Sequence, residues 1–162
     1  MVAVTDSKKA QLTFPADDQI LITREFDAPR HLVYKAITTP ELVKRWWHAK
    51  RGEVTLAELD VRPGGAWRQV MVTPDGMEVG FHGEYREIVP NERIVSTEVY
   101  EGAPGEPAVN TLTLEEVDGR TTLTLLMQLP NKETRDAIVE SGMEAGLQDA
   151  YALLEEVAVT LI

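Results

Sequence analysis

Between residues 52 and 129 the sequence repeats one pattern, in which apolar and polar residues alternate briefly and then give way to a turn. The alternating segments are GEVTLAELDV, AWRQVMV, EVGFHGEYREI, RIVSTEVY, NTLTLEEV and RTTLTLLMQL. Successive side chains of a strand point to opposite faces, so this period predicts strands with one apolar face. The connections RPGG, TPDG, VPNE and DG are short enough to join antiparallel neighbours, and EGAPGEPA is a longer loop. The sequence therefore predicts an antiparallel meander of about six strands.

One further strand and two short helices are predicted before this meander. QILITREF (Gln19–Phe26) alternates in the same way and predicts the first strand. Asp27 is then expected to cap a short helix in DAPRHLVYKAIT, because its apolar residues recur at helical spacing. Thr39, followed by Pro40 and Glu41, is expected to start a second short helix. Residues 1–18 are polar and patternless, which predicts a loose lead-in.

The segment from residue 131 to the C-terminus predicts one long amphipathic helix. Asn131 can cap its start, and Glu133 favours the positive end of the helix dipole. Gly142 and Gly146 would lie on one face, each costing about 1 kcal/mol relative to alanine. Close packing of helix on sheet and room for a ligand both account for such a pair. The apolar stripe comprises Val139, Met143, Leu147, Ala150, Leu154 and Val157.

A sheet with one apolar face needs a cover, and the C-terminal helix is the long element left to provide it. We therefore expect an α+β fold in which a curved antiparallel sheet of about six to seven strands surrounds the long C-terminal helix. Two short helices follow the first strand. Since no composition break or internal repeat divides residues 19–162, we expect them to form a single domain after the lead-in of residues 1–18.

The composition excludes several classes of partner. The net charge of -11 leaves no basic footprint for nucleic acid or for an anionic membrane surface. The absence of cysteine excludes disulfides, thiolate catalysis and cysteine metal sites. No apolar run is long enough to span a membrane, so we expect no membrane insertion. The N-terminal residues lack a secretory signal pattern, and a cytoplasmic location is the default expectation.

Recognisable catalytic motifs are missing from the sequence. The histidines His31, His48 and His82 are far apart, and no metal-ligating, nucleophile-elbow or phosphate-loop pattern occurs. His82 and Glu84 would share one strand face and could form an acid–base pair, but they would project opposite to Phe81 and Tyr85, toward solvent or a neighbour. We therefore predict no catalytic residue, no metal site and no cofactor.

A curved sheet around a helix tends to leave a cavity between the layers, and aromatic and Met side chains would line it here. The same residues are also typical of an ordinary core, which is the commoner role for each of them taken singly. In ELVKRWWHAK, Trp46 is expected to face the core, whereas Trp47 is expected at the cavity entrance or the sheet edge. The predicted cavity lining comprises Trp46, Trp47, Trp67, Gln69, Met71, Phe81, Gly83, Tyr85, Met143, Gly146, Leu147 and Ala150.

The segments REFDAPRHLVYKAITTPELVKRWW, ELDVRPGGAWRQVMVTPDG, GEYREIVPNERIVSTE and ESGMEAG together resemble a known family. It is the heat-shock-protein ATPase activator-like (Aha-type) branch of the START-like (SRPBCC) superfamily, which includes birch-pollen-allergen-like proteins and polyketide cyclases. The resemblance runs from about Ile20 to about Val157. It implies the helix-grip fold with a hydrophobic cavity. The family often has a tryptophan after the second helix glycine, where this chain has Leu147.

Three functions are compatible with this resemblance. The first is a START-like domain that binds a small hydrophobic or amphipathic molecule, lipid-, polyketide- or aromatic-like, between sheet and helix, and it is favoured over catalysis. The second is an enzyme of the polyketide cyclase or hydrolase type, which needs an ionisable group in the cavity. The third is a module that modulates a chaperone ATPase or a stress response. A homodimer is compatible with all three. The ionisable candidates are Tyr85, Glu98, Tyr100 and Asp149.

Overall fold

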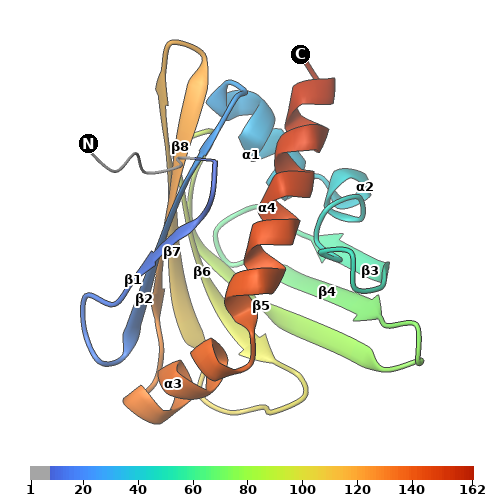
Figure 1. Ribbon diagram of the computed structural model, residues 1–162, viewed down its shortest axis with the longest axis vertical. Coiled ribbons are helices and arrows are strands. Elements are labelled where there is room, and N and C mark those ends of the chain that lie inside the picture. Colours follow the sequence, from blue (N-terminus) through green and yellow to red (C-terminus); the bar gives the residue numbers. More distant parts are fainter. Residues whose placement is uncertain (1–7) are drawn as a thin grey trace, which may run out of the picture.

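A curved sheet lies behind the long C-terminal helix in the computed structural model, which describes residues 8–162 (Figure 1). The strands are β1 (Gln11–Thr13), β2 (Gln19–Phe26), β3 (Glu53–Leu59), β4 (Ala66–Val72), β5 (Glu78–Val89), β6 (Arg93–Tyr100), β7 (Ala108–Val117) and β8 (Arg120–Gln128). The helices are α1 (Arg30–Thr38), α2 (Pro40–Val43), α3 (Lys132–Glu140) and α4 (Met143–Thr160).

The eight strands form one antiparallel sheet in the order β1-β2-β8-β7-β6-β5-β4-β3. Strands β3 to β8 follow one another as a meander, and β2 then pairs with β8, the last strand of the meander. The α+β, helix-grip fold expected from the sequence is confirmed. The sheet has one strand more than predicted, because β1 lies inside the expected lead-in and pairs with β2. Residues 1–7 of that lead-in are outside the described residues.

The first helix begins later than the sequence predicts. Asp27 does not cap it, because its carboxylate binds Lys8 at 2.5 Å and Arg120 at 3.0 Å instead. The helix starts at Arg30, whose backbone N–H donates to Glu116 Oε1 at 2.8 Å. A carboxylate from β7 therefore satisfies the helix terminus, which is a tertiary contact that no local pattern contains. Thr39 precedes the second helix as expected, with extended backbone.

The predicted long C-terminal helix is two helices. Asn131 caps α3 by accepting a hydrogen bond from the Thr134 backbone N–H at 2.8 Å, as the sequence predicts. The break falls at Gly142, whose φ of 86° is left-handed and ends the helical hydrogen-bond pattern. The expectation that Gly142 and Gly146 share one helix face is therefore wrong, because Gly142 lies at the start of α4 and only Gly146 is inside a helix.

The core lies between the sheet and the helices α1 and α4, on what is called the inner face of the sheet below. Its largest enclosed side chains come from β2, β7, β8, α1 and α4, as well as from α2. A second, smaller cluster, formed by Trp67, Tyr85 and Ile94, lies on β4, β5 and β6. The fully buried hydrophobic residues of the first cluster include Ile20, Ile22, Phe26, Val33, Val43, Leu114, Leu123 and Leu154.

Two register irregularities bend the sheet around this core. One lies in β3 between Val54 and Leu56, and the other in β5 between Tyr85 and Glu87. An extra residue in one strand of a pair increases local twist and bends that strand. Strands β3 to β5 consequently run across the lower part of the molecule at a steep angle to β2 and β8 (Figure 1). Among the described helices, none is long and apolar enough to cross a membrane.

Candidate functional site

Strand register brings the predicted lining residues of β4 and β5 together on the inner face. Trp67 lies opposite Gly83, and Gln69 lies opposite Phe81. Phe81 in turn lies opposite Tyr100 of β6, with ring centroids 5.1 Å apart. Directly opposed residues of an antiparallel pair project from the same face. The alternation in the sequence is therefore sufficient to select these residues, while the register determines which of them are neighbours.

Gly83 is required by close packing. A Cβ atom at this position would lie 1.9 Å from the Thr97 carbonyl oxygen and 2.8 Å from Trp67 Nε1. Trp67 lies over the glycine and donates its indole N–H to the Thr97 carbonyl at 3.1 Å. The gap that the missing side chain leaves in β5 is thus filled by the Trp67 ring.

The two adjacent tryptophans have different environments. Trp46 is buried and donates its indole N–H to the Ala36 carbonyl of α1 at 3.0 Å, so it belongs to the core as predicted. Trp47 is only partly buried and meets Phe81 edge-to-face, with ring centroids 5.8 Å apart. Because Trp47 also packs against the first core cluster, it joins that cluster to the aromatic side chains of β5 and β6.

The predicted lining residues of α4 lie at different depths. Ala150 is buried, whereas Met143 and Leu147 are partly buried against the first cluster. A Cβ atom on Gly146 would meet only the Arg51 side chain, at 3.9 Å. Arg51 bonds to Asp149 Oδ2 at 2.8 Å, so the loop before β3 is held against α4 at this glycine.

Burial divides the predicted lining into two groups. Trp46, Trp67, Tyr85 and Ala150 are core residues, each no more than 9% exposed. The remaining residues keep partial exposure although they belong to the inner face of β4 and β5, to α4 or to the turn that follows α2. These partly exposed residues are Trp47, Gln69, Met71, Phe81, Gly83, Met143, Gly146 and Leu147.

A carboxyl group and an amide lie beside the partly exposed residues. Glu98 of β6 is partly buried, and Asn110 of β7, which is 9% exposed, donates from Nδ2 to Glu98 Oε2 at 3.4 Å. Burial raises the pKa of the Glu98 carboxyl to about 6, although the Asn110 hydrogen bond acts in the opposite direction. Asn110 was missed from the predicted lining. Its signal was a polar residue in the apolar alternation Ala108, Asn110, Leu112 and Leu114.

Tyr151 of α4 faces the same region. Its ring packs edge-on against Phe26 at 5.8 Å, and the residue is buried. Burial raises the pKa of its hydroxyl, the negative charge of Glu98 raises it further, and Arg24 lowers it. Arg24 pairs with Glu155 and donates to the Glu25 carbonyl at 2.6 Å, both through Nη1, while its buried Nε has no hydrogen-bond partner within residues 8–162.

The other ionisable candidates are placed less favourably for chemistry in an interior site. Tyr100 is 43% exposed, and Asp149 is held by Arg51. Tyr85 is buried in the second cluster, and this burial raises the pKa of its hydroxyl. Glu98 is thus the candidate carboxyl group that lies both partly buried and outside an ion pair within residues 8–162.

On the outer face His82 pairs with Glu101, whereas the sequence offered Glu84 as a possible partner. His82 Nδ1 lies 2.9 Å from Glu101 Oε2, and Arg68 donates two hydrogen bonds to the same carboxylate, each at 2.9 Å. The bonds from Arg68 and then from His82 lower the pKa of Glu101 to about 2. All three side chains are solvent-accessible, so this is a surface ion cluster.

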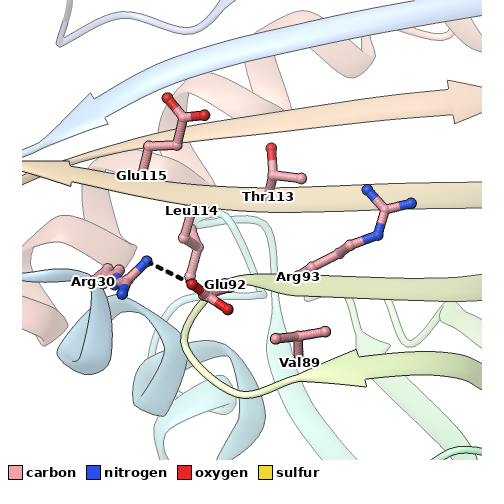
Figure 2. Close-up of a pocket in the computed structure, with 7 residues that line it drawn as sticks. All are labelled: Arg30, Val89, Glu92, Arg93, Thr113, Leu114 and Glu115. Atoms are coloured by element: carbon pink, nitrogen blue, oxygen red, sulfur yellow. Dashed lines mark hydrogen bonds and ion pairs between the residues drawn. The ribbon is translucent and has the colours of Figure 1, made fainter.

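Two surface pockets lie away from the predicted lining, and neither includes any of its residues. Figure 2 shows the first, about 310 Å³, where Arg30 at the start of α1 bonds to Glu92 at 3.4 Å. The second, about 710 Å³, lies between Lys8, Lys9 and the N-terminal half of α4. Within residues 8–162, no three His, Asp or Glu side chains gather closely enough to hold a metal ion.

Solved structures share this architecture at low sequence identity. A Rhodobacter sphaeroides protein is 27% identical, with a TM-score of 0.88, over 94% of this chain and 99% of its own. A Nitrosomonas europaea protein is 25% identical, with a TM-score of 0.80, over 89% and 96%. The AHSA1-like protein from Aeromonas hydrophila, 18% identical with a TM-score of 0.67 over 84% and 92%, supports the fold alone.

Sequence comparison supplies the family. No protein of curated function matches the chain. The sequence model described as "Activator of Hsp90 ATPase homolog 1-like protein" matches residues 27–158, which include every element from α1 to nearly the end of α4. The fold, in which the sheet curves around α4, agrees with the sequence match. The chain therefore belongs to the Activator of Hsp90 ATPase homolog 1-like family of START-like proteins.

Proposed function

We propose that this protein binds a small hydrophobic or amphipathic molecule between the sheet and α4. The observation that carries the proposal is the uneven closure of the inner face. At β2, β7 and β8 the enclosed side chains are almost inaccessible, as Ile22, Leu114 and Leu123 illustrate. Near β4 and β5, large apolar side chains such as Trp47 and Phe81 keep partial exposure. Apolar walls with a few polar groups are typical of small-molecule sites.

Occupancy can be tested directly. We expect native mass spectrometry after mild purification, or titration with a fluorescent fatty acid, to detect a one-to-one complex. Leu147→Trp should weaken binding because it adds an indole where Leu147 packs partly buried against the core. Val159→Trp is the matched control, since Val159 is on the same helix and is 42% exposed.

The outcomes distinguish binding at the proposed site from nonspecific adsorption of the probe. Equal weakening by both tryptophan variants would place the probe on the outside of α4. If neither method detected a bound molecule in the wild-type chain, the proposal would be wrong. Trp47→Ala adds a second readout, because a residue at the entrance should change the rate of probe uptake more than the free energy of unfolding.

A second candidate function is stimulation of the Hsp90 ATPase, and the family description favours it. The test is the ATPase rate of purified Hsp90 with and without this chain, under matched protein concentrations. A rate increase that saturates with added chain would support it, and an unchanged rate would remove it. This outcome is independent of small-molecule binding, because the two assays use different readouts.

A further inference from the structure

Glu98 and Asn110 project from the inner face at the boundary between its closed and partly exposed parts. Glu98 lies opposite Ala108, and Asn110 lies opposite both Ser96 and the core residue Met127. The contact of 3.4 Å between Asn110 Nδ2 and Glu98 Oε2 joins the two side chains. Glu98 is two residues from Tyr100, whose ring lies against Phe81.

These two side chains leave acceptors without donors. Asn110 Oδ1 is buried and has no hydrogen-bond partner among residues 8–162. An unmet buried acceptor is destabilising, and native proteins keep few of them. Glu98 takes part in no ion pair within the same residues, and its ionised carboxylate can only accept hydrogen bonds. A partner for this position must therefore donate.

The surroundings favour a positive charge on that donor. Tyr151 contributes a neutral hydroxyl from α4, and Arg24 of β2, the cation that acts on this hydroxyl, pairs with Glu155 through Nη1. The aromatic rings of Trp47, Phe81 and Tyr100 form a continuous series of contacts beside the carboxylate. Ring faces attract cations, and a carboxylate prefers a charged donor to a neutral one.

We propose that Glu98 and Asn110 form the polar end of the binding site and receive the protonated amine of an amphiphilic molecule. Its apolar part would lie against Trp47, Phe81 and Leu147. The inference rests on the proposed function, since it assumes that a molecule enters between sheet and α4, and adds the chemical class of its head group.

The experiment compares three molecules that share one apolar chain and differ in the head group, namely octylamine, octanol and octanoate. Calorimetric titration of the full chain at neutral pH should give the tightest binding for octylamine and the weakest for octanoate. Glu98→Gln should weaken octylamine at least about tenfold, because it removes a charge-assisted contact, while changing octanol little. Glu84→Gln removes the same charge from the outer, exposed side of β5 and should change neither.

The outcomes distinguish failure of the head-group inference from failure of the proposed hydrophobic binding. If octanoate binds as tightly as octylamine, or if Glu98→Gln leaves octylamine binding unchanged, the head-group inference is wrong and hydrophobic binding stands. Equal weakening by Glu84→Gln would show that octylamine responds only to the net negative charge, which also overturns it. If none of the three molecules binds, both proposals fail. Asn110→Leu provides a second variant and should also weaken octylamine.

Discussion

At the scale of single residues, close contacts and buried polar atoms determine what each position of the inner face can do. Gly83 belongs to the Trp67–Thr97 packing, and Glu98 belongs to a polar pair with Asn110. The sequence pattern identified which residues share the inner face. It could not show that the Trp67 ring fills the gap at Gly83, because that depends on register and on the rotamer of a neighbour.

Gly83→Ala is expected to lower the free energy of unfolding by at least about 2 kcal/mol, because its Cβ atom would overlap the Thr97 carbonyl. Gly105→Ala is the control, since no heavy atom lies within 4 Å of a Cβ atom there. Urea denaturation of the two variants measures the difference. Equal stabilities would contradict the packing described for Trp67.

Glu98→Gln is expected to stabilise the fold at neutral and higher pH. Burial raises the pKa of Glu98 to about 6 from an ordinary value of 4.5, so ionisation opposes folding. Below about pH 4.5 the Glu98 carboxyl is protonated in both the folded and the unfolded state. As the pH rises through about 6, the wild type therefore loses stability relative to the variant. Thermal unfolding across this range should show an advantage of about 2 kcal/mol for the variant above pH 6. A pH-independent difference would contradict the burial of this carboxyl.

At the scale of elements, the strands were predictable because period-two alternation and turn residues both identify them. The short strand β1 was not predictable, because three residues are too few to show an alternation of apolar and polar side chains. The break between α3 and α4 was missed because Gly142 fits an amphipathic helical pattern as well as a helix end. Only its left-handed backbone distinguishes the two cases.

Two alanine substitutions four residues apart should have opposite effects. Gly142→Ala forces a side chain into a left-handed conformation and should lower the free energy of unfolding by about 1 kcal/mol. Gly146→Ala removes a glycine from the interior of α4 with no atom closer than 3.9 Å, and should raise it by about 0.5–1 kcal/mol. Chemical denaturation provides both values, and effects of equal sign would contradict the helix break.

At the scale of the whole molecule, an ion network ties the N-terminal part of the described chain to β2, β8 and α4. Lys8 contacts Asp27 and Glu155, Arg24 also pairs with Glu155, and Arg120 reaches Asp27. Arg24 is 5% exposed. These pairs join residues more than ninety positions apart in most cases, so no sequence pattern could predict them.

Glu155→Ala should lower the free energy of unfolding by about 3 kcal/mol, because it leaves the buried Arg24 without its carboxylate. Asp60→Ala is the comparison, since it breaks the exposed pair with Arg62 and should cost less than about 1 kcal/mol. Calorimetric unfolding of both variants measures the contrast. Similar losses of stability would mean that water reaches Arg24 in the Glu155 variant and replaces the missing carboxylate.

The central claim is that a small amphiphile enters beside Trp47, between the sheet and α4. The three tryptophans provide the test, because each contributes one indole N–H signal in a ¹H–¹⁵N NMR spectrum. Trp46 and Trp67 donate these protons to the backbone carbonyls of Ala36 and Thr97. On titration with octylamine, we expect the Trp47 signal to shift in a saturable way and the other two to shift much less. Saturable binding that leaves Trp47 unchanged would contradict the claim.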